Sequence, residues 1–136
     1  MPVGKKFKLY SGSRKTAKAT ASIMQGTGKV RINAVPVEVV TPEAARDRII
    51  TPLEIVGSLR DKVDINVTVK GGGVMGQAEA ATVAISRALA GHVRGNEMRT
   101  KLTEFDKHLL SGDHRRTESK KFGGPGARRK KQKSYR

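Results

Sequence analysis

Alternation of apolar and polar residues along the chain predicts two half-buried β-strands. In residues 63–70 a β-branched apolar residue stands at every second position, from Val63 to Val69, and polar residues fill the gaps. A period of two sends successive side chains to opposite faces of a sheet. Residues 15–24 alternate in the same way, with alanines and an isoleucine on the apolar side. We therefore expect a sheet that is covered on one face only.

Two shorter strands are predicted between these segments. Residues 29–33 and residues 35–39 each place valine or isoleucine at alternate positions. Because glycine tolerates positive φ, the Gly-Thr-Gly of residues 26–28 predicts a hairpin loop that returns the chain from residues 15–24 into the next strand. Pro36 has no N–H to donate to a neighbouring strand, so the segment that contains it is expected at an edge of the sheet.

Two proline-containing signals predict the starts of two short helices. Thr41 places a capping hydroxyl before Pro42 at the first helical position. Thr51 and Pro52 repeat this arrangement, and Glu54 completes a capping box. Because the two starts are so close together, we expect a break between the helices at Thr51.

Two further helices are predicted in the second half of the chain. The first runs from about residue 74 to residue 90, and the second begins at Asn96. The second carries one apolar stripe, at spacings of four, three and four, formed by Met98, Leu102, Phe105 and Leu109. Gly112 is well placed to end it.

Gly71, Gly73 and Gly76 form a G-x-G-x-x-G pattern between a predicted strand and a predicted helix. In a dinucleotide-binding fold a second parallel strand, ending near an acidic residue, must follow that helix. The segment after the helix has no strand pattern, and no Lys-Ser or Lys-Thr pair indicates a phosphate-binding loop. We therefore expect the glycines to turn the chain and, with the alanines that follow, to let the helix pack closely on the sheet. No cofactor is expected, and the helix N-terminus is at most a secondary contact for a phosphate.

The large positive charge of the chain indicates that it binds a polyanion. The 136 residues include 28 lysines and arginines against 12 acidic residues, a net charge of +16. Residues 111–136 hold ten of the basic and two of the acidic residues, so half of the excess, +8, lies in less than a fifth of the chain. A chain with this much like charge repels itself, and a nucleic acid relieves the repulsion. An anionic membrane surface is a weaker alternative, because the tail has no apolar face.

Composition divides the chain into two parts. Residues 1–110 are expected to form a globular body, and residues 111–136 an extended basic tail. Fully extended, the tail from Asp113 could reach roughly 80 Å, at about 3.3–3.6 Å per residue. Its arginines can fork onto phosphates, and Tyr135 can stack on a base or ribose. Because the tail has no apolar period of its own, we expect it to order only on its partner.

Candidate catalytic and metal-binding groups are sparse. His92, His108 and His114 lie in different segments without the spacing of metal ligands. No serine has the setting of a nucleophile, and most carboxylates flank basic residues, where solvated ion pairs explain them. The absence of cysteine removes thiolate metal sites and disulfides. The chain is therefore expected not to be an enzyme and to bind no metal, and no apolar run is long enough to span a membrane.

Several stretches together match one family pattern. The most specific is GGGVMGQ at residues 71–77, followed by SRAL at residues 86–89. The other matches are GSRKTA at 12–17, GKVRIN at 28–33, ESKKFG at 118–123, GARRK at 126–130 and SYR at 134–136. With these stretches, nearly the whole chain resembles the ninth protein of the small ribosomal subunit, in its archaeal or eukaryotic form.

The resemblance implies a fold and a role. The fold would be α+β, a four-stranded sheet with helices packed on one face, a left-handed β-α-β crossover and a long extended basic C-terminal arm. The role would be structural, in the head of the small subunit, where such proteins bind the 3′ major domain of the rRNA beside neighbouring head proteins. The tail would run to the peptidyl site and touch the anticodon stem-loop of the tRNA. Such a protein is cytoplasmic and ribosome-bound, with no membrane partner.

The resemblance also implies two groups of contact residues. The tRNA would be contacted by the last four residues, Lys133, Ser134, Tyr135 and Arg136. The rRNA would be contacted by Arg14 and Lys15 in the body and by Arg115, Arg116, Lys120, Lys121, Arg128, Arg129, Lys130 and Lys131 in the tail. No catalytic and no metal-binding residue is implied.

Two other functions stay open from the sequence. A catalytic RNA-processing protein would cleave RNA in a metal-dependent way, and the lack of a carboxylate cluster argues against it. A free chromatin-type DNA binder would not travel with small ribosomal subunits at moderate salt, whereas a ribosomal protein would. Sedimentation therefore separates these possibilities.

Overall fold

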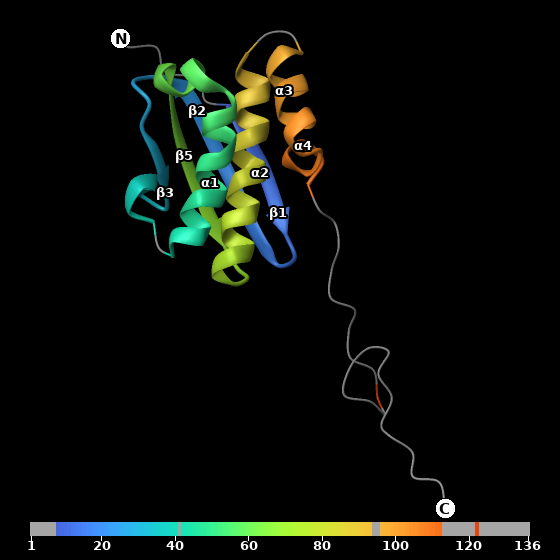
Figure 1. Cartoon of the computed structure of the whole chain (residues 1–136). Helices are drawn as coiled ribbons and strands as arrows, with labels where there is room; N and C mark the ends of the chain where they lie inside the picture. Colours follow the sequence, from blue (N-terminus) through green and yellow to red (C-terminus); the bar gives the residue numbers. More distant parts are fainter. Residues whose placement is uncertain (1–7, 41, 94–95, 113–121, 123–136) are drawn as a thin grey trace, which may run out of the picture.

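The fold is α+β, with a mixed sheet on one side and helices on the other (Figure 1). The computed structural model describes residues 8–40, 42–93, 96–112 and Phe122. Within these residues the sheet has five strands: β1 Lys8–Arg14, β2 Ala17–Gln25, β3 Val30–Ile32, β4 Val35–Pro36 and β5 Val63–Lys70. Their order across the sheet is β1-β2-β5-β3-β4.

The two predicted alternating strands are confirmed as β2 and β5. Along β5 the valine and isoleucine positions are buried, and the polar positions between them are exposed or half-buried. β2 begins at Ala17 rather than at Lys15, because Lys15 and Thr16 form the two-residue turn between β1 and β2. Lys15 has φ +53° in this turn. Pairing of β2 with β5 is antiparallel, so their apolar sides form one continuous buried face.

The glycines at residues 26–28 do not form the predicted hairpin. β5 lies between β2 and β3, antiparallel to β2 and parallel to β3. The loop after β2 therefore crosses the N-terminal end of β5. There the Gly26 N–H donates to Lys62 O at 2.9 Å, and the Ile65 N–H donates to Lys29 O at 2.9 Å. A local glycine pattern indicates a turn, but it cannot show that a later strand inserts between the two strands it joins.

The sheet also differs from the expected four strands. β1 was not predicted from the pattern, because its inward positions include Tyr10 and Gly12 rather than a run of aliphatic residues. The strand predicted at residues 35–39 is reduced to the two residues of β4, because the chain continues as a 3-10 helix, Val37–Val39, that buries Val37. Pro36 does lie on an edge strand, as predicted.

Asn33 extends the parallel pairing of β3 and β5 beyond the last residue of β3. Its N–H donates to Val67 O at 2.8 Å. Its side-chain Oδ1 accepts the Val69 N–H at 2.8 Å, and its Nδ2 donates to Val69 O at 3.3 Å. The side-chain amide thus replaces the backbone of a further strand residue. The backbone itself turns into β4, with φ +50° at Asn33 and +68° at Ala34.

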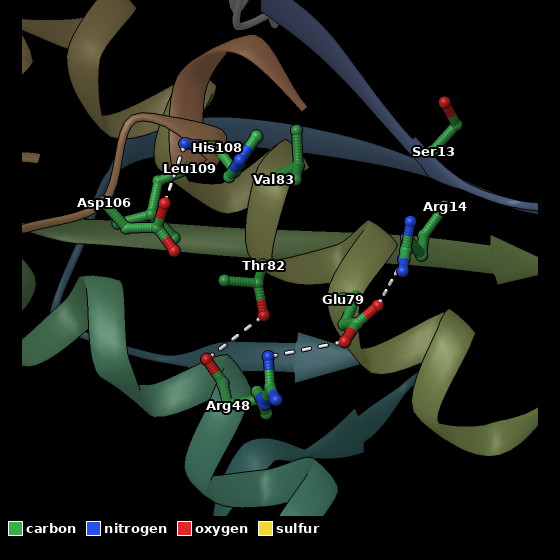
Figure 2. Close-up of a pocket in the computed structure, with 9 residues that line it drawn as sticks. All are labelled: Ser13, Arg14, Arg48, Glu79, Thr82, Val83, Asp106, His108 and Leu109. Carbon is green, nitrogen blue, oxygen red and sulfur yellow. Dashed lines mark hydrogen bonds and ion pairs between the residues drawn. The ribbon is translucent and has the colours of Figure 1, made fainter. Parts of the chain in front are cut away.

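The first helix, α1, runs without interruption over Glu43–Ile55, so the predicted break at Thr51 is wrong. Pro52 lies inside this helix and is buried. Because proline has no N–H, it leaves the carbonyl of Arg48, four residues earlier, without its helical donor. The Thr82 hydroxyl of the neighbouring helix donates to that carbonyl at 3.1 Å (Figure 2). The same hydroxyl also donates to Ala78 O of its own helix at 2.7 Å, so its one proton is shared between the two carbonyls. This tertiary contact therefore replaces in part the hydrogen bond that Pro52 removes.

The long helix α2, Val74–His92, lies beside α1 on the sheet (Figure 1). Its predicted bounds are confirmed to within two residues. The alanines expected to face the sheet are buried, namely Ala78, Ala80, Ala81, Ala84 and Ala88. Their small side chains let α2 contact β1 and β2 closely. A 3-10 helix, Gly57–Lys62, joins α1 to β5.

The predicted last helix is divided into α3, Glu97–Phe105, and α4, His108–Ser111, which pack beside α2 (Figure 1). Leu102 and Leu109 are buried, as the apolar stripe predicted. Phe105 is not, because its side chain is 63% exposed. The extended backbone of Asp106, with φ −159°, ends α3 directly after Phe105. Gly112 follows α4 with φ +75°, as expected of a glycine at a helix end.

Candidate nucleic-acid interface

The glycine stretch serves the fold, as predicted. Gly71 and Gly72 have φ of +77° and +68°, a conformation that side chains disfavour. A Cβ added to Gly71 would lie 2.7 Å from Thr16 O, and one added to Gly72 would lie 2.9 Å from the Ala17 Cβ. The chain therefore turns sharply off β5 while touching the turn between β1 and β2.

Close packing of α2 on the sheet requires glycine at position 12 and not, as predicted, at position 76. A Cβ at Gly76 would make only an ordinary contact, 3.8 Å from the Ala17 Cβ, so packing does not demand glycine there. At Gly12 of β1 an added Cβ would lie 2.5 Å from Ala80 O and 2.6 Å from Ala84 N. Gly12 is therefore the residue that lets the α2 backbone lie directly on the sheet.

A cavity of ≈ 290 Å³ lies where β1, α1, α2 and the α3–α4 connection meet (Figure 2). At its wall the Arg14 Nε lies 2.7 Å from Glu79 Oε2, and the Arg48 Nη1 lies 3.3 Å from Glu79 Oε1. One carboxylate thus bridges two guanidinium groups and leaves the trio with one net positive charge. The Arg14 side chain is only 18% exposed. This predicted RNA contact therefore faces the cavity and α2 rather than the open surface.

The ionisable groups that line the cavity contact other groups of the same chain. Glu79 is held by two arginines, and Asp106 Oδ1 accepts the backbone N–H of His108 at 2.9 Å. The Nδ1 atom of the His108 ring lies 3.2 Å from Gly112 O, so the ring contacts the backbone just after α4. Among the described residues no cluster of three or more His, Asp or Glu could hold a metal ion.

Lys15, the other body residue predicted to contact RNA, lies apart from Arg14. It occupies the tip of the β1–β2 turn and is exposed. The same end of the sheet carries Gly71, whose neighbour across the turn is Thr16. Successive residues of one motif thus point to different parts of the surface, and the motif by itself did not distinguish them.

Asp64, which sequence reasoning did not select, organises the loop between β2 and β3. Its Oδ1 accepts the N–H groups of Thr27, Gly28 and Lys29 at 3.0, 3.1 and 2.9 Å. The hydrogen bond from Lys29, followed by the one from Thr27, lowers the pKa of this carboxyl below its usual value. The loop that crosses the N-terminal end of β5 is therefore held in place by the Asp64 carboxylate at that same end.

Arg87 of α2 connects the end of the described body to the sheet, and sequence reasoning did not assign this role to it either. Its Nε donates to Leu110 O at 2.7 Å, and its Nη1 donates to Ser11 O at 2.7 Å. One planar guanidinium thus fixes α4 against β1. Because Gly112 follows α4 directly, Arg87 fixes the end of this described segment relative to the sheet.

The tail residues selected from the sequence lie outside the described part of the chain. This applies to the predicted tRNA contacts, Lys133, Ser134, Tyr135 and Arg136. It applies equally to the predicted rRNA contacts Arg115, Arg116, Lys120, Lys121, Arg128, Arg129, Lys130 and Lys131. These assignments stay predictions.

The fold and the charge define a small, strongly basic α+β protein. A family model described as "Ribosomal protein S9/S16" matches residues 12–136. The chain is 53% identical to the small ribosomal subunit protein uS9 of Halobacterium salinarum, over 93% of this chain and 96% of the relative. It is 49% identical to uS9 of Desulfurococcus amylolyticus, over 96% and 94%. It is 44% identical to uS9 of Methanothrix thermoacetophila, over 93% and 96%.

The chain belongs to the ribosomal protein S9/S16 family, as the sequence motifs indicated. This is a family of structural proteins and not of enzymes, in agreement with the prediction. In the part of the chain that the structure describes, no helix combines the length and apolarity needed to cross a membrane.

Proposed function

We infer that this protein is a structural constituent of the head of the small ribosomal subunit, cytoplasmic and ribosome-bound. In this proposal the body, residues 1–110, binds the 3′ major domain of the small-subunit rRNA beside neighbouring head proteins. The tail, residues 111–136, runs through rRNA and ends at the anticodon stem-loop of peptidyl-site tRNA. The observation that carries the proposal is the family match over residues 12–136, which includes the whole tail.

The connection between β3 and β5 supports the fold expected of such a protein. These strands are parallel neighbours, and α1 lies on the chain between them. In Figure 1 both strands run downwards, α1 lies in front of the sheet, and β5 lies to the right of β3. That arrangement supports a left-handed β-α-β crossover, the unusual hand that the resemblance implies.

The position of the last described helix and the distribution of charge support separate roles for the body and the tail. The last described helix, α4, ends at Ser111, next to the proposed boundary. The tail carries half of the net charge of +16 on 26 residues that include ten lysines and arginines. Cationic side chains on such a segment contact phosphates without reading base sequence. Arg87 would aim this segment by fixing α4 to β1.

Deletion of Ser134, Tyr135 and Arg136 tests the tRNA contact. We expect the shortened protein to fold and to enter small subunits as the full chain does, because in this proposal the deleted residues belong to the tail and not to the body. Binding of tRNA at the peptidyl site of purified subunits should weaken about 5- to 150-fold, the loss of one to three kcal/mol of charge-assisted contact. Filter binding with labelled tRNA measures this affinity.

Two single variants refine the experiment. Arg136→Lys keeps the charge but loses the forked geometry, whereas Arg136→Gln loses both. We expect the glutamine variant to weaken binding more than the lysine variant. Unchanged tRNA affinity in subunits that contain the shortened protein would refute the tRNA contact. Failure of the full chain to sediment with small subunits at moderate salt would refute the ribosomal role itself.

A further inference from the structure

The helices lie on one face of the sheet (Figure 1). The opposite face carries polar and cationic side chains. Alternation along β2 and β5 places Lys18, Thr20, Thr68 and Lys70 on this face, and all four are exposed. The strand register sets Lys18 directly opposite Lys70, and Thr20 directly opposite Thr68. A hollow of ≈ 460 Å³ opens at this position, and its lining consists of these four residues with Thr16 and Gly71. We call it the open-face hollow.

The pairing of Lys18 with Lys70 is unfavourable for the free protein. Side chains directly opposite each other on an antiparallel pair have Cβ atoms about 5 Å apart, and like charges there are destabilising. Among the described residues neither ammonium group has an ion-pair partner. An anion in the open-face hollow would compensate both charges at once.

No carboxylate of the described strands lies near the open-face hollow. On the uncovered face of the described strands Asp64 is the single carboxylate, and it lies at the opposite end of β5 from Lys70. The two are six positions apart on one strand, about 20 Å at about 3.3 Å per residue. Asp64 is also occupied by three backbone N–H groups. Arg31 of β3, which pairs with Asn66, adds a further positive charge to this face.

We propose that the open-face hollow binds the sugar-phosphate backbone of RNA, with Lys18 and Lys70 on phosphates and the threonine hydroxyls on phosphate oxygens or ribose 2′-OH groups. This proposal rests on the proposed ribosomal function and adds the surface of the body that performs it. Two lysines and three hydroxyls without a nearby carboxylate suit a backbone anion. The helix-covered face uses its arginines differently, since Arg14 and Arg48 are both engaged by Glu79.

The double variant Lys18→Gln with Lys70→Gln tests the proposal. Affinity of the full chain for a transcript of the 3′ major domain of small-subunit rRNA is measured over a range of KCl concentrations. We expect a loss of about 25- to 60-fold at about 0.1 M salt, and a log–log salt slope shallower by about 1.4–1.8. Thermal unfolding of the free variant should occur no lower than that of the wild type, because a like-charge pair has been removed.

A matched control is the double variant Lys62→Gln with Lys107→Gln. These lysines are also exposed, and they lie in the 3-10 helix before β5 and in the α3–α4 connection. The net charge changes equally in both double variants, so the general attraction to RNA falls equally. Equal losses for the two variants would overturn the proposal. A wild-type protein that binds this transcript no better than an unrelated RNA would instead count against the proposed function.

A tethered probe decides between RNA and protein as the occupant of this face. Because the chain has no cysteine, Thr68→Cys creates a single attachment point for an iron chelate that cleaves nearby RNA. In assembled small subunits we expect cuts in the 3′ major domain from position 68. Glu104→Cys on α3 is the comparison on the helix side. Cuts from position 104 without cuts from position 68 would show that a protein, or solvent, lies against the open face and would overturn the proposal.

Discussion

At the scale of single residues, Asp64 shows how a charge can shape a connection. The loop after β2 passes over the N-terminal end of β5. Three N–H groups of this loop converge on one oxygen of the Asp64 carboxylate. The converging hydrogen bonds favour the ionised form, so the pKa of Asp64 lies below the usual value of 3.8. Protonation of this group therefore opposes folding.

This gives a prediction for acid stability. A carboxyl whose pKa is lower in the folded than in the unfolded chain stabilises the fold above the unfolded pKa, and the contribution is lost as pH falls through the folded pKa. The advantage of the wild type over Asp64→Asn should therefore be full well above pH 3.8 and shrink below it. Urea denaturation between about pH 6 and about pH 2 measures this difference. A difference that is constant with pH would show that the charge is not responsible.

At the scale of elements, the contact between α2 and β1 decides how closely the helical layer approaches the sheet. Gly12 supplies the space, because atoms of the α2 backbone would meet any Cβ placed there. Backbone atoms cannot move aside as a flexible side chain can. The G-x-G-x-x-G pattern drew attention to Gly76 instead, but that residue has room for a methyl group.

Two alanine substitutions should accordingly have opposite effects on the free protein. Gly12→Ala forces α2 away from β1 and should lower the free energy of unfolding by about 1–3 kcal/mol. Gly76→Ala improves helix propensity without a clash and should raise the free energy of unfolding by about 0.4–1 kcal/mol. Urea denaturation followed by circular dichroism measures both. Equal effects of the two changes would contradict the packing described for Gly12.

At the scale of the whole molecule, charge is divided between a body with a buried core and a tail with a high density of cations. Each part has a net charge of +8, but the tail carries it on 26 residues. Binding that depends on phosphate contacts falls with salt, by about 0.7 to 0.9 in log–log slope for each phosphate engaged. The tail should therefore account for much of the salt dependence of rRNA binding.

Replacing Arg128, Arg129, Lys130 and Lys131 by glutamine tests this expectation. The log–log slope for binding to the 3′ major-domain transcript should become shallower by about 2.8 to 3.6 if all four engage phosphates. Titration of affinity against KCl concentration gives the slope. A slope equal to that of the wild type would mean that these four residues do not contact the backbone.

Much of the architecture was predictable because periodicity is a local property. The strand at residues 63–70 and the helix beginning at Val74 were predicted with their bounds nearly correct, since each carries its pattern over many residues. The predicted break at Thr51 was wrong, and Thr82, from another helix, partly satisfies the carbonyl that Pro52 leaves without a donor. β1 was missed because a strand that packs against a helix backbone through Gly12 has no aliphatic alternation to detect.

The candidate site residues likewise divide into those that the sequence could indicate and those that only contacts between distant segments bring together. Motif residues pointed to the family and to a cationic tail, because composition and spacing are properties of the chain itself. Lys18 and Lys70 were not selected, since 51 residues separate them in the sequence and only strand pairing brings them together. Arg87 lay within a recognised motif, but its bonds to Ser11 and Leu110 depend on three elements meeting.

By itself the sequence determined the α+β class, the main strands and helices, the excess of positive charge and the family. Only the tertiary structure decided that β5 lies between β2 and β3, that Arg14 faces a carboxylate while Lys15 faces outwards, and that two lysines share one hollow. The reason is physical: periodicity and charge are set by neighbours along the chain, whereas strand order and cross-strand pairs are set by contacts between distant residues.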